Sequence, residues 1–145
     1  MKVVVQRSLS AKCSVDGVIT GEINHGLMIL VGFTHTDAID NCIKMASKVA
    51  KLRIFDDSEG KMNLSIKDVG GSILSISQFT LYADASGGNR PSFTNAMNPL
   101  DANKLYEAFN LELEKCGLKV EKGIFQAHME ISFTNDGPVT IILEN

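Results

Sequence analysis

The change of hydrophobic period along the chain is the feature that most constrains its fold. Apolar residues recur at helical spacing in only two segments, residues 37–55 and 98–117. The remainder divides into about eight or nine short strand-like runs. These runs mostly follow one another directly and do not alternate with helices. The pattern predicts an α+β domain, in which a curved, barrel-like and largely antiparallel or mixed β-sheet is covered by two amphipathic helices.

Local signals predict how the strands are connected. Asp16-Gly17 separates two strand-like runs and predicts a tight hairpin. Residues 72–82 have the composition of one long strand. Residues 135–138, Asn-Asp-Gly-Pro, are typical of a turn between the last two strands.

The two helices carry end signals of different strength. Thr36 or Asp37 can cap the first helix. In the second, Asn98 suits the N-cap, Pro99 the first helical position and Gly117 the C-terminal end. The expected buried faces are Ile39, Cys42, Ile43, Ala46, Val49 and Ala50 in the first helix, and Ala102, Leu105, Phe109 and Leu113 in the second.

Size, charge and cysteine usage narrow the class of protein. The 145 residues suit one domain, residues 1–145. A formal net charge of −3 argues against a broad grip on duplex DNA, although Lys48, Lys51, Arg53 and Arg90 can form a small basic patch. Three distant cysteines without a C-x-x-C pair favour a reducing compartment. Without a targeting or membrane-spanning pattern, we expect a cytoplasmic protein with no membrane partner.

Polar side chains gather at the end of an otherwise apolar strand, at Ser77, Gln78 and Thr80, with Phe79 among them. Strand alternation would place Ser77 and Phe79 on one face and Gln78 and Thr80 on the other. A hydroxyl needs a base to become a nucleophile, and the sequence has neither a G-x-S-x-G elbow nor an obvious acid–His partner. Taken alone, these residues favour an ordinary strand with hydrogen-bonded hydroxyls.

The segment NDGPVT, residues 135–140, carries the second candidate site. Pro138 removes a backbone donor where the last strand should begin to pair. X-Pro bonds adopt the cis form far more often than other peptide bonds. A cis Gly137-Pro138 bond would point two successive carbonyls the same way, as acceptors for an ammonium group. Local sequence alone favours a surface turn. The histidines show no metal-ligand spacing, so we predict no metal or other cofactor.

Taken together, the segments SQFTLYAD, RPSF, LRIFDDSEGKMNLSIKDVGG and NDGPVT, in this order and spacing, resemble the D-aminoacyl-tRNA deacylases. The similarity extends from VVVQR near the N-terminus to the final strand. It implies hydrolysis of the ester between a D-amino acid and the 3′-terminal adenosine of tRNA. It also implies a homodimer with its active site at the subunit interface.

The resemblance implies roles for individual residues. Ser77 to Thr80 would line the pocket of one subunit, with Gln78 orienting the terminal adenosine or its ribose. Gly137 and Pro138, joined by a cis bond, would reach in from the other subunit and hold the α-amino group. An L side chain would collide with this turn, whereas glycine would be tolerated, as on glycyl-tRNA. The further expected residues are Asn135, Met129 and Phe125 for substrate binding, and Arg7 for support of the Gly-Pro segment.

Two chemical mechanisms are open, and two other functions compete. Either Thr80 is the nucleophile, or the 2′-hydroxyl of the terminal ribose helps to activate water; we favour the second because Thr80 has no evident base. The alternatives are a non-catalytic module that binds RNA 3′ ends and a metal-dependent hydrolase using His128. The chain departs from the family at Gln126, where Gly is usual, at His128, where an acidic residue is common, and at Asn89, where a basic residue is common.

Overall fold

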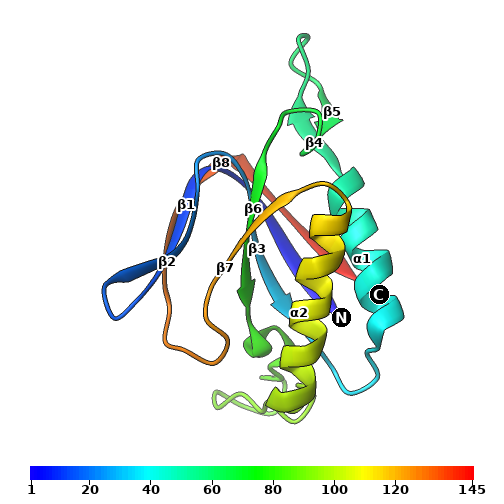
Figure 1. Cartoon of the computed structure of the whole chain (residues 1–145). Coiled ribbons are helices and arrows are strands. Elements are labelled where there is room, and N and C mark those ends of the chain that lie inside the picture. The colour runs from blue at the N-terminus through cyan, green and yellow to red at the C-terminus, as the bar shows by residue number, and fades with distance from the viewer.

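The computed structural model describes residues 1–145 as one curved mixed sheet, a small hairpin and two long helices (Figure 1). The strand order is β2-β1-β3-β6-β7, and β8 pairs with the other side of β1. The β3–β6 and β6–β7 pairs are parallel, whereas the pairs made by β1 are antiparallel. The main sheet consists of β1 (Lys2–Val15), β2 (Val18–Ile23), β3 (Gly26–Gly32), β6 (Ser72–Ser77), β7 (Lys119–Lys122) and β8 (Glu130–Glu144).

The predicted hairpin and the barrel-like curvature are both confirmed. Asp16 and Gly17 have φ values of 50° and 78°, the positive values that a two-residue hairpin turn requires. The hairpin brings β2 close to β7 at the open side of the sheet. A Cβ atom at Gly21 would lie 2.8 Å from the backbone oxygen of Lys122, so only glycine allows this approach. The sheet therefore almost closes into a barrel.

Two helices, α1 (Ile39–Lys51) and α2 (Pro99–Lys115), pack side by side against one face of the sheet (Figure 1). Neither is long and apolar enough to cross a membrane. The predicted ends of α2 are confirmed: Asn98 Oδ1 accepts a hydrogen bond from the Asp101 amide at 3.1 Å, and Gly117 follows the helix with a φ of 84°. Of the predicted α2 face, Leu105, Phe109 and Leu113 are buried and Ala102 is half-buried; Tyr106 also belongs to this face.

The start and buried face of α1 differ from the prediction. Ala38 occupies the N-cap, and its amide donates to Asn41 Oδ1. Asp37 instead binds the Met1 ammonium group and the Thr34 amide. Ile39 and Ile43 remain 48% and 45% exposed because the buried stripe is rotated towards Met45. The buried residues of α1 are Cys42, Met45, Ala46, Val49 and Ala50.

Residues 72–82 do not form one strand. Strand β6 ends at Ser77, and a short 3-10 helix, η1 (Phe79–Tyr82), follows it. The turn is possible because the chain passes close to Gly32 at the end of β3, where a Cβ atom would lie 2.8 Å from the Gln78 oxygen. The predicted strand alternation of side chains from Ser77 to Thr80 is therefore wrong.

The predicted turn at residues 135–138 is also wrong. Strand β8 continues from Glu130 to Glu144, and β1 is long enough to pair with both of its halves. Gln6 of β1 pairs with Thr140 and Ser8 pairs with Asn135, so residues 136–139 lie opposite Arg7 alone. These four residues form a wide bulge, which we call the Gly-Pro bulge. The remaining strands, β4 (Arg53–Asp56) and β5 (Met62–Ser65), form the small separate hairpin.

Candidate active site

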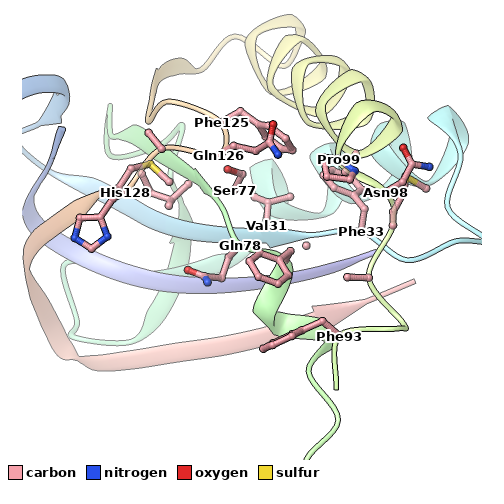
Figure 2. A pocket seen from close by; sticks show the side chains of 18 of the residues that line it. Val31, Phe33, Ser77, Gln78, Phe93, Asn98, Pro99, Phe125, Gln126 and His128 are labelled. Carbon is pink, nitrogen blue, oxygen red and sulfur yellow. The ribbon is translucent and has the colours of Figure 1, made fainter. Parts of the chain in front are cut away.

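A cavity of about 690 Å³ opens where β3 and β6 end, beneath the first residues of α2. Figure 2 shows Ser77 in its middle, with His128 at one end and Asn98 and Pro99 at the other. Most of its wall is apolar, with a few polar groups among the apolar ones, as is typical of small-molecule sites. The lining includes Val31, Gly32, Phe33, Ile76, Ser77, Gln78, Phe79, Phe93, Ala96, Met97, Asn98, Pro99, Ala102, Phe125, Gln126, Ala127, His128, Met129 and Ile131.

The polar strand end lies at the floor of this pocket. Strand β6 carries Ser77 into it, and the Gln78 amide donates to the Val31 oxygen at 2.7 Å, which fixes the end of the strand against β3. Gln78 Nε2 donates to Thr80 Oγ1 at 2.5 Å. Thr80 itself is exposed and lies next to the pocket. The first backbone N–H groups of η1, at Phe79 and Thr80, have no acceptor within the helix and are available to an incoming oxygen.

Aromatic rings frame the pocket at two depths. At the mouth, Phe79 and Phe93 pack edge to face with centroids 5.0 Å apart, although they are 57% and 41% exposed. Deeper in, Phe125 packs against Tyr106, whose hydroxyl donates to the Ser75 oxygen at 2.7 Å. Burial raises the pKa of Tyr106 to about 12, so this hydroxyl keeps its proton. Tyr106 therefore anchors the inner wall.

No protein base stands beside Thr80. Its hydroxyl is hydrogen-bonded to Gln78, an amide that cannot remove a proton. His128 lines the pocket at the end away from Asn98 and Pro99. The structure contains no group of three or more His, Cys, Asp or Glu side chains that could hold a metal ion. Within one chain, the pocket thus offers backbone donors, the side-chain amides of Gln78, Asn98 and Gln126, the Ser77 hydroxyl and the His128 imidazole.

The Gly-Pro bulge is held from the sheet side by Arg7, which is only 6% exposed. Arg7 Nε lies 3.0 Å from Asp136 Oδ2 and 3.3 Å from the Asp136 oxygen. Arg7 Nη1 donates to the Ile54 oxygen at 2.7 Å and lies 3.5 Å from Asp56 Oδ2. One guanidinium group therefore ties the bulge to β4.

The base of the bulge is closed by Asn135. Its Oδ1 accepts from the Val139 amide at 3.1 Å, and its Nδ2 donates to Thr140 Oγ1 at 3.1 Å. Between these contacts, Gly137 has a φ of 122° and the Gly137-Pro138 bond is cis. Both residues are exposed, and neither lines the pocket of the same chain.

The predicted residues thus fall into two groups. Ser77, Gln78, Phe79, Phe125 and Met129 line one pocket, with Thr80 beside it. Arg7, Asn135, Gly137 and Pro138 form the bulge and its supports, which are not part of that pocket. Both the oxygen and the nitrogen of the Asn135 side chain are hydrogen-bonded at the base of the bulge, to Val139 and Thr140.

Sequence reasoning missed several residues that shape the pocket. Gly32 could have been found, because a glycine at a strand end often marks a close backbone approach. Tyr106 reads as a routine helix residue, and Phe93 as part of a loop, so neither gave a signal. Gln126, which the sequence marked only as a departure from the family, adopts a φ of 64° in the pocket wall, a conformation that glycine adopts without cost.

Solved structures share this architecture. One is described as a c-Myc DNA Unwinding Element Binding Protein; its TM-score is 0.93 at 38% sequence identity, over 100% of this chain and 99% of that one. Another is described as a probable eukaryotic D-amino acid tRNA deacylase; it has a TM-score of 0.83 at 16% identity, over 98% and 97% of the two chains, and shows the same fold. The fold is therefore of the class found in tRNA deacylases.

Sequence comparison defines the family. The family model described as D-Tyr-tRNA(Tyr) deacylase matches residues 4–144. A D-aminoacyl-tRNA deacylase of Deinococcus radiodurans is 54% identical over 144 residues, which are 99% of each chain. One of Geobacillus sp. is 53% identical over 145 residues, covering 100% of this chain and 95% of the relative. The chain belongs to the D-Tyr-tRNA(Tyr) deacylase family, as the sequence motifs predicted.

Proposed function

We propose that this protein hydrolyses the ester bond of D-aminoacyl-tRNA in the cytoplasm and releases a free D-amino acid and tRNA. The observation that carries the proposal is the pocket at the end of β6, where Ser77, Gln78 and the free N–H groups of η1 meet in a chain of this family. An apolar cavity with a few polar groups suits the terminal adenosine and its amino acid.

The pocket and the Gly-Pro bulge belong to one site built from two subunits. Within one chain the bulge is exposed, and the lining of the pocket contains no carboxylate that could pair with an ammonium group. The exposed Phe79 and Phe93 at the mouth provide apolar surface that a second chain would cover. In a homodimer, the bulge of one subunit would enter the pocket of the other and complete it.

Chiral selection would follow from backbone atoms of the bulge. The Gly137 and Pro138 carbonyls would accept hydrogen bonds from the α-amino group of the substrate. An L side chain would then collide with the bulge, whereas a D side chain would point away from it, and glycine would pass, as on glycyl-tRNA charged to tRNA(Ala). A clash excludes an L side chain only if the bulge is rigid. Arg7 and Asn135 hold the bulge from both sides.

For the chemical step we favour water as the nucleophile. Its oxygen attacks the ester carbonyl with help from the 2′-hydroxyl of the terminal ribose, the acyl C–O bond breaks, and the 3′ oxygen of the ribose takes up a proton. The N–H groups of Phe79 and Thr80 would stabilise the oxyanion, at about 3–4 kcal/mol per donor. Gln78 would orient the ribose, and its amide, which donates to Thr80 Oγ1, cannot act as a base for the threonine.

The decisive experiment compares deacylation of D-Tyr-tRNA and L-Tyr-tRNA in the presence and in the absence of a chelator. We expect rapid loss of the D ester alone. If both esters survive while the protein still binds the tRNA end, the protein is a non-catalytic RNA-binding module and the catalytic roles are wrong. Loss of activity with the chelator would instead support a metal-dependent hydrolase.

Substitution of Thr80 distinguishes the two mechanisms, in which the nucleophile is either water or the Thr80 hydroxyl. Thr80→Ala should keep turnover of D-Tyr-tRNA within about tenfold, because general acid–base or nucleophilic groups usually contribute more than that. Thr80→Ser is the matched control. A loss of the order of 10⁴-fold in Thr80→Ala alone would identify Thr80 as the nucleophile.

A further inference from the structure

Helix α1 and the first residue of β4 carry a row of cations that form no salt bridge. Seven of the fourteen Lys and Arg side chains form salt bridges with carboxylates. Four of the other seven lie within ten residues and are all exposed. These are Lys44, Lys48, Lys51 and Arg53, which we call the basic stripe. In a chain of net charge −3, such a local excess of positive charge requires an explanation.

Stabilisation of the C-terminal end of α1 explains only part of the basic stripe. Lys48 and Lys51 lie in the last turn of α1, where they oppose the negative end of the helix dipole. Lys44 precedes that turn and forms no salt bridge with Asp40, which lies one turn earlier in the helix. Arg53 lies beyond the helix, where its Nε and Nη2 donate to the oxygen atoms of Asn63. The dipole therefore does not account for Lys44 or Arg53.

The spacing of the lysines suits a phosphate backbone. Lys44, Lys48 and Lys51 follow one another at intervals of four and three residues, so they lie on one face of the helix. They span about 10 Å of the helix axis at 1.5 Å per residue. Successive phosphates of one strand are separated by about 3.4 Å along a duplex axis, so the stripe can contact two or three of them.

The basic stripe lies in the chain between a residue of the pocket and a residue that contacts the support of the Gly-Pro bulge. Helix α1 begins shortly after Phe33, which lines the pocket. Its other end leads directly into β4, as the upper part of Figure 1 shows. There the oxygen of Ile54, the residue after Arg53, binds Arg7, which holds the Gly-Pro bulge. A nucleic acid on the stripe would therefore lie close to the bulge.

We propose that the basic stripe binds the backbone phosphates of the aminoacyl-tRNA outside its 3′ end. The inference rests on the proposed function for the identity of the RNA. Because the stripe ends one residue before Ile54, whose oxygen binds the arginine that holds the bulge, it would serve the tRNA whose 3′ end that bulge meets in the pocket of the partner subunit. The pocket recognises the terminal nucleotide, and the stripe supplies affinity that depends on salt but not on sequence.

The test is the triple variant Lys44→Gln, Lys48→Gln, Lys51→Gln. For the intact protein, the affinity for tRNA measured by filter binding should fall with salt more steeply than for the variant. Three lost phosphate contacts reduce the slope of log K against log salt by about 2.7. Raising the salt concentration from 50 to 200 mM should therefore weaken tRNA binding about 40-fold more in the intact protein than in the variant.

The matched control changes the net charge by the same amount at three other lysines. Its substitutions are Lys104→Gln, Lys115→Gln and Lys119→Gln, all at lysines that pair with carboxylates. The control should keep the salt slope of the intact protein. If both triple variants have the same slope, the stripe does not bind tRNA and the inference is wrong.

A minimal substrate separates this inference from the proposed function. The D-tyrosyl ester of adenosine has no phosphates, so the stripe variant should hydrolyse it as fast as the intact protein, while its KM for D-Tyr-tRNA rises at least about tenfold. Equal loss on both substrates would place the defect in the pocket and overturn the inference. If the intact protein hydrolyses neither substrate, the proposed function fails, and the binding slopes still decide whether the stripe contacts tRNA.

Discussion

Replacing Arg7 by Met tests whether the Gly-Pro bulge depends on one buried guanidinium group. Met keeps an unbranched apolar chain but removes the charge and all donors. The variant loses the 2.7 Å hydrogen bond to the Ile54 oxygen and the 3.0 Å ion pair with Asp136. It therefore releases the bulge from both β1 and β4.

The expected loss of stability can be estimated from these contacts. A hydrogen bond from a charged donor to a buried acceptor contributes about 1.5–3 kcal/mol. The Asp136 side chain is 39% exposed, so solvent screens its ion pair, which adds at most about 1 kcal/mol. We expect Arg7→Met to lower the free energy of unfolding by about 1.5–4 kcal/mol, measured by urea denaturation.

Function provides the sharper readout. With the bulge released, L-Tyr-tRNA should be deacylated faster relative to D-Tyr-tRNA, because the clash that excludes L side chains weakens. Asp136→Asn, which removes only the screened ion pair, is the control and should lie close to the parent protein in both assays. An Arg7→Met variant with unchanged stability and unchanged D-to-L preference would refute the role given to Arg7.

Three further predictions follow from positions beneath and beside the pocket. Gly32→Ala brings a Cβ atom to 2.8 Å from the Gln78 oxygen and should cost about 1–3 kcal/mol in urea denaturation, whereas Gly87→Ala, in open space, should change stability by less than about 0.5 kcal/mol. Gln126→Gly relieves a φ of 64° and should stabilise the fold by about 1 kcal/mol; a lower midpoint of urea unfolding would contradict this. Burial raises the pKa of Tyr106 to about 12, so the tyrosine loses its proton at lower pH in the unfolded chain than in the folded one. The free energy of unfolding should therefore be unaffected by this group below about pH 10 and should fall as the pH rises from about 10 towards 12. Tyr106→Phe should flatten this alkaline loss when unfolding is compared at about pH 9 and about pH 11.

Regular elements with strong local signals were predictable from the sequence. The hairpin at Asp16-Gly17 and the ends of α2 at Asn98 and Gly117 depend on residues that favour one backbone conformation by themselves. The α+β class and the curved mixed sheet followed from the order of hydrophobic periods. Here local preference and tertiary packing agree.

The errors occurred where a distant segment decides the local conformation. The strand expected over residues 72–82 ends at Ser77 because η1 turns across Gly32, far away in sequence. The turn expected at residues 135–138 is a bulge because β1 pairs on both sides of it. The same residues were singled out as functional from their motifs, and the structure places them in a pocket and a separate bulge whose geometry the sequence did not predict. Their roles stay a prediction. The pairing of the pocket with a second subunit stays a prediction.

Strand β8 has a consequence for the behaviour of the protein in concentrated solution. It forms the edge of the sheet over fifteen residues and pairs only with β1. A flat edge of this length could add strands of other molecules without limit. The Gly-Pro bulge divides the edge into two shorter stretches, and Pro138 offers no N–H group to an incoming strand. The feature proposed to select the substrate therefore also protects the protein against open-ended aggregation.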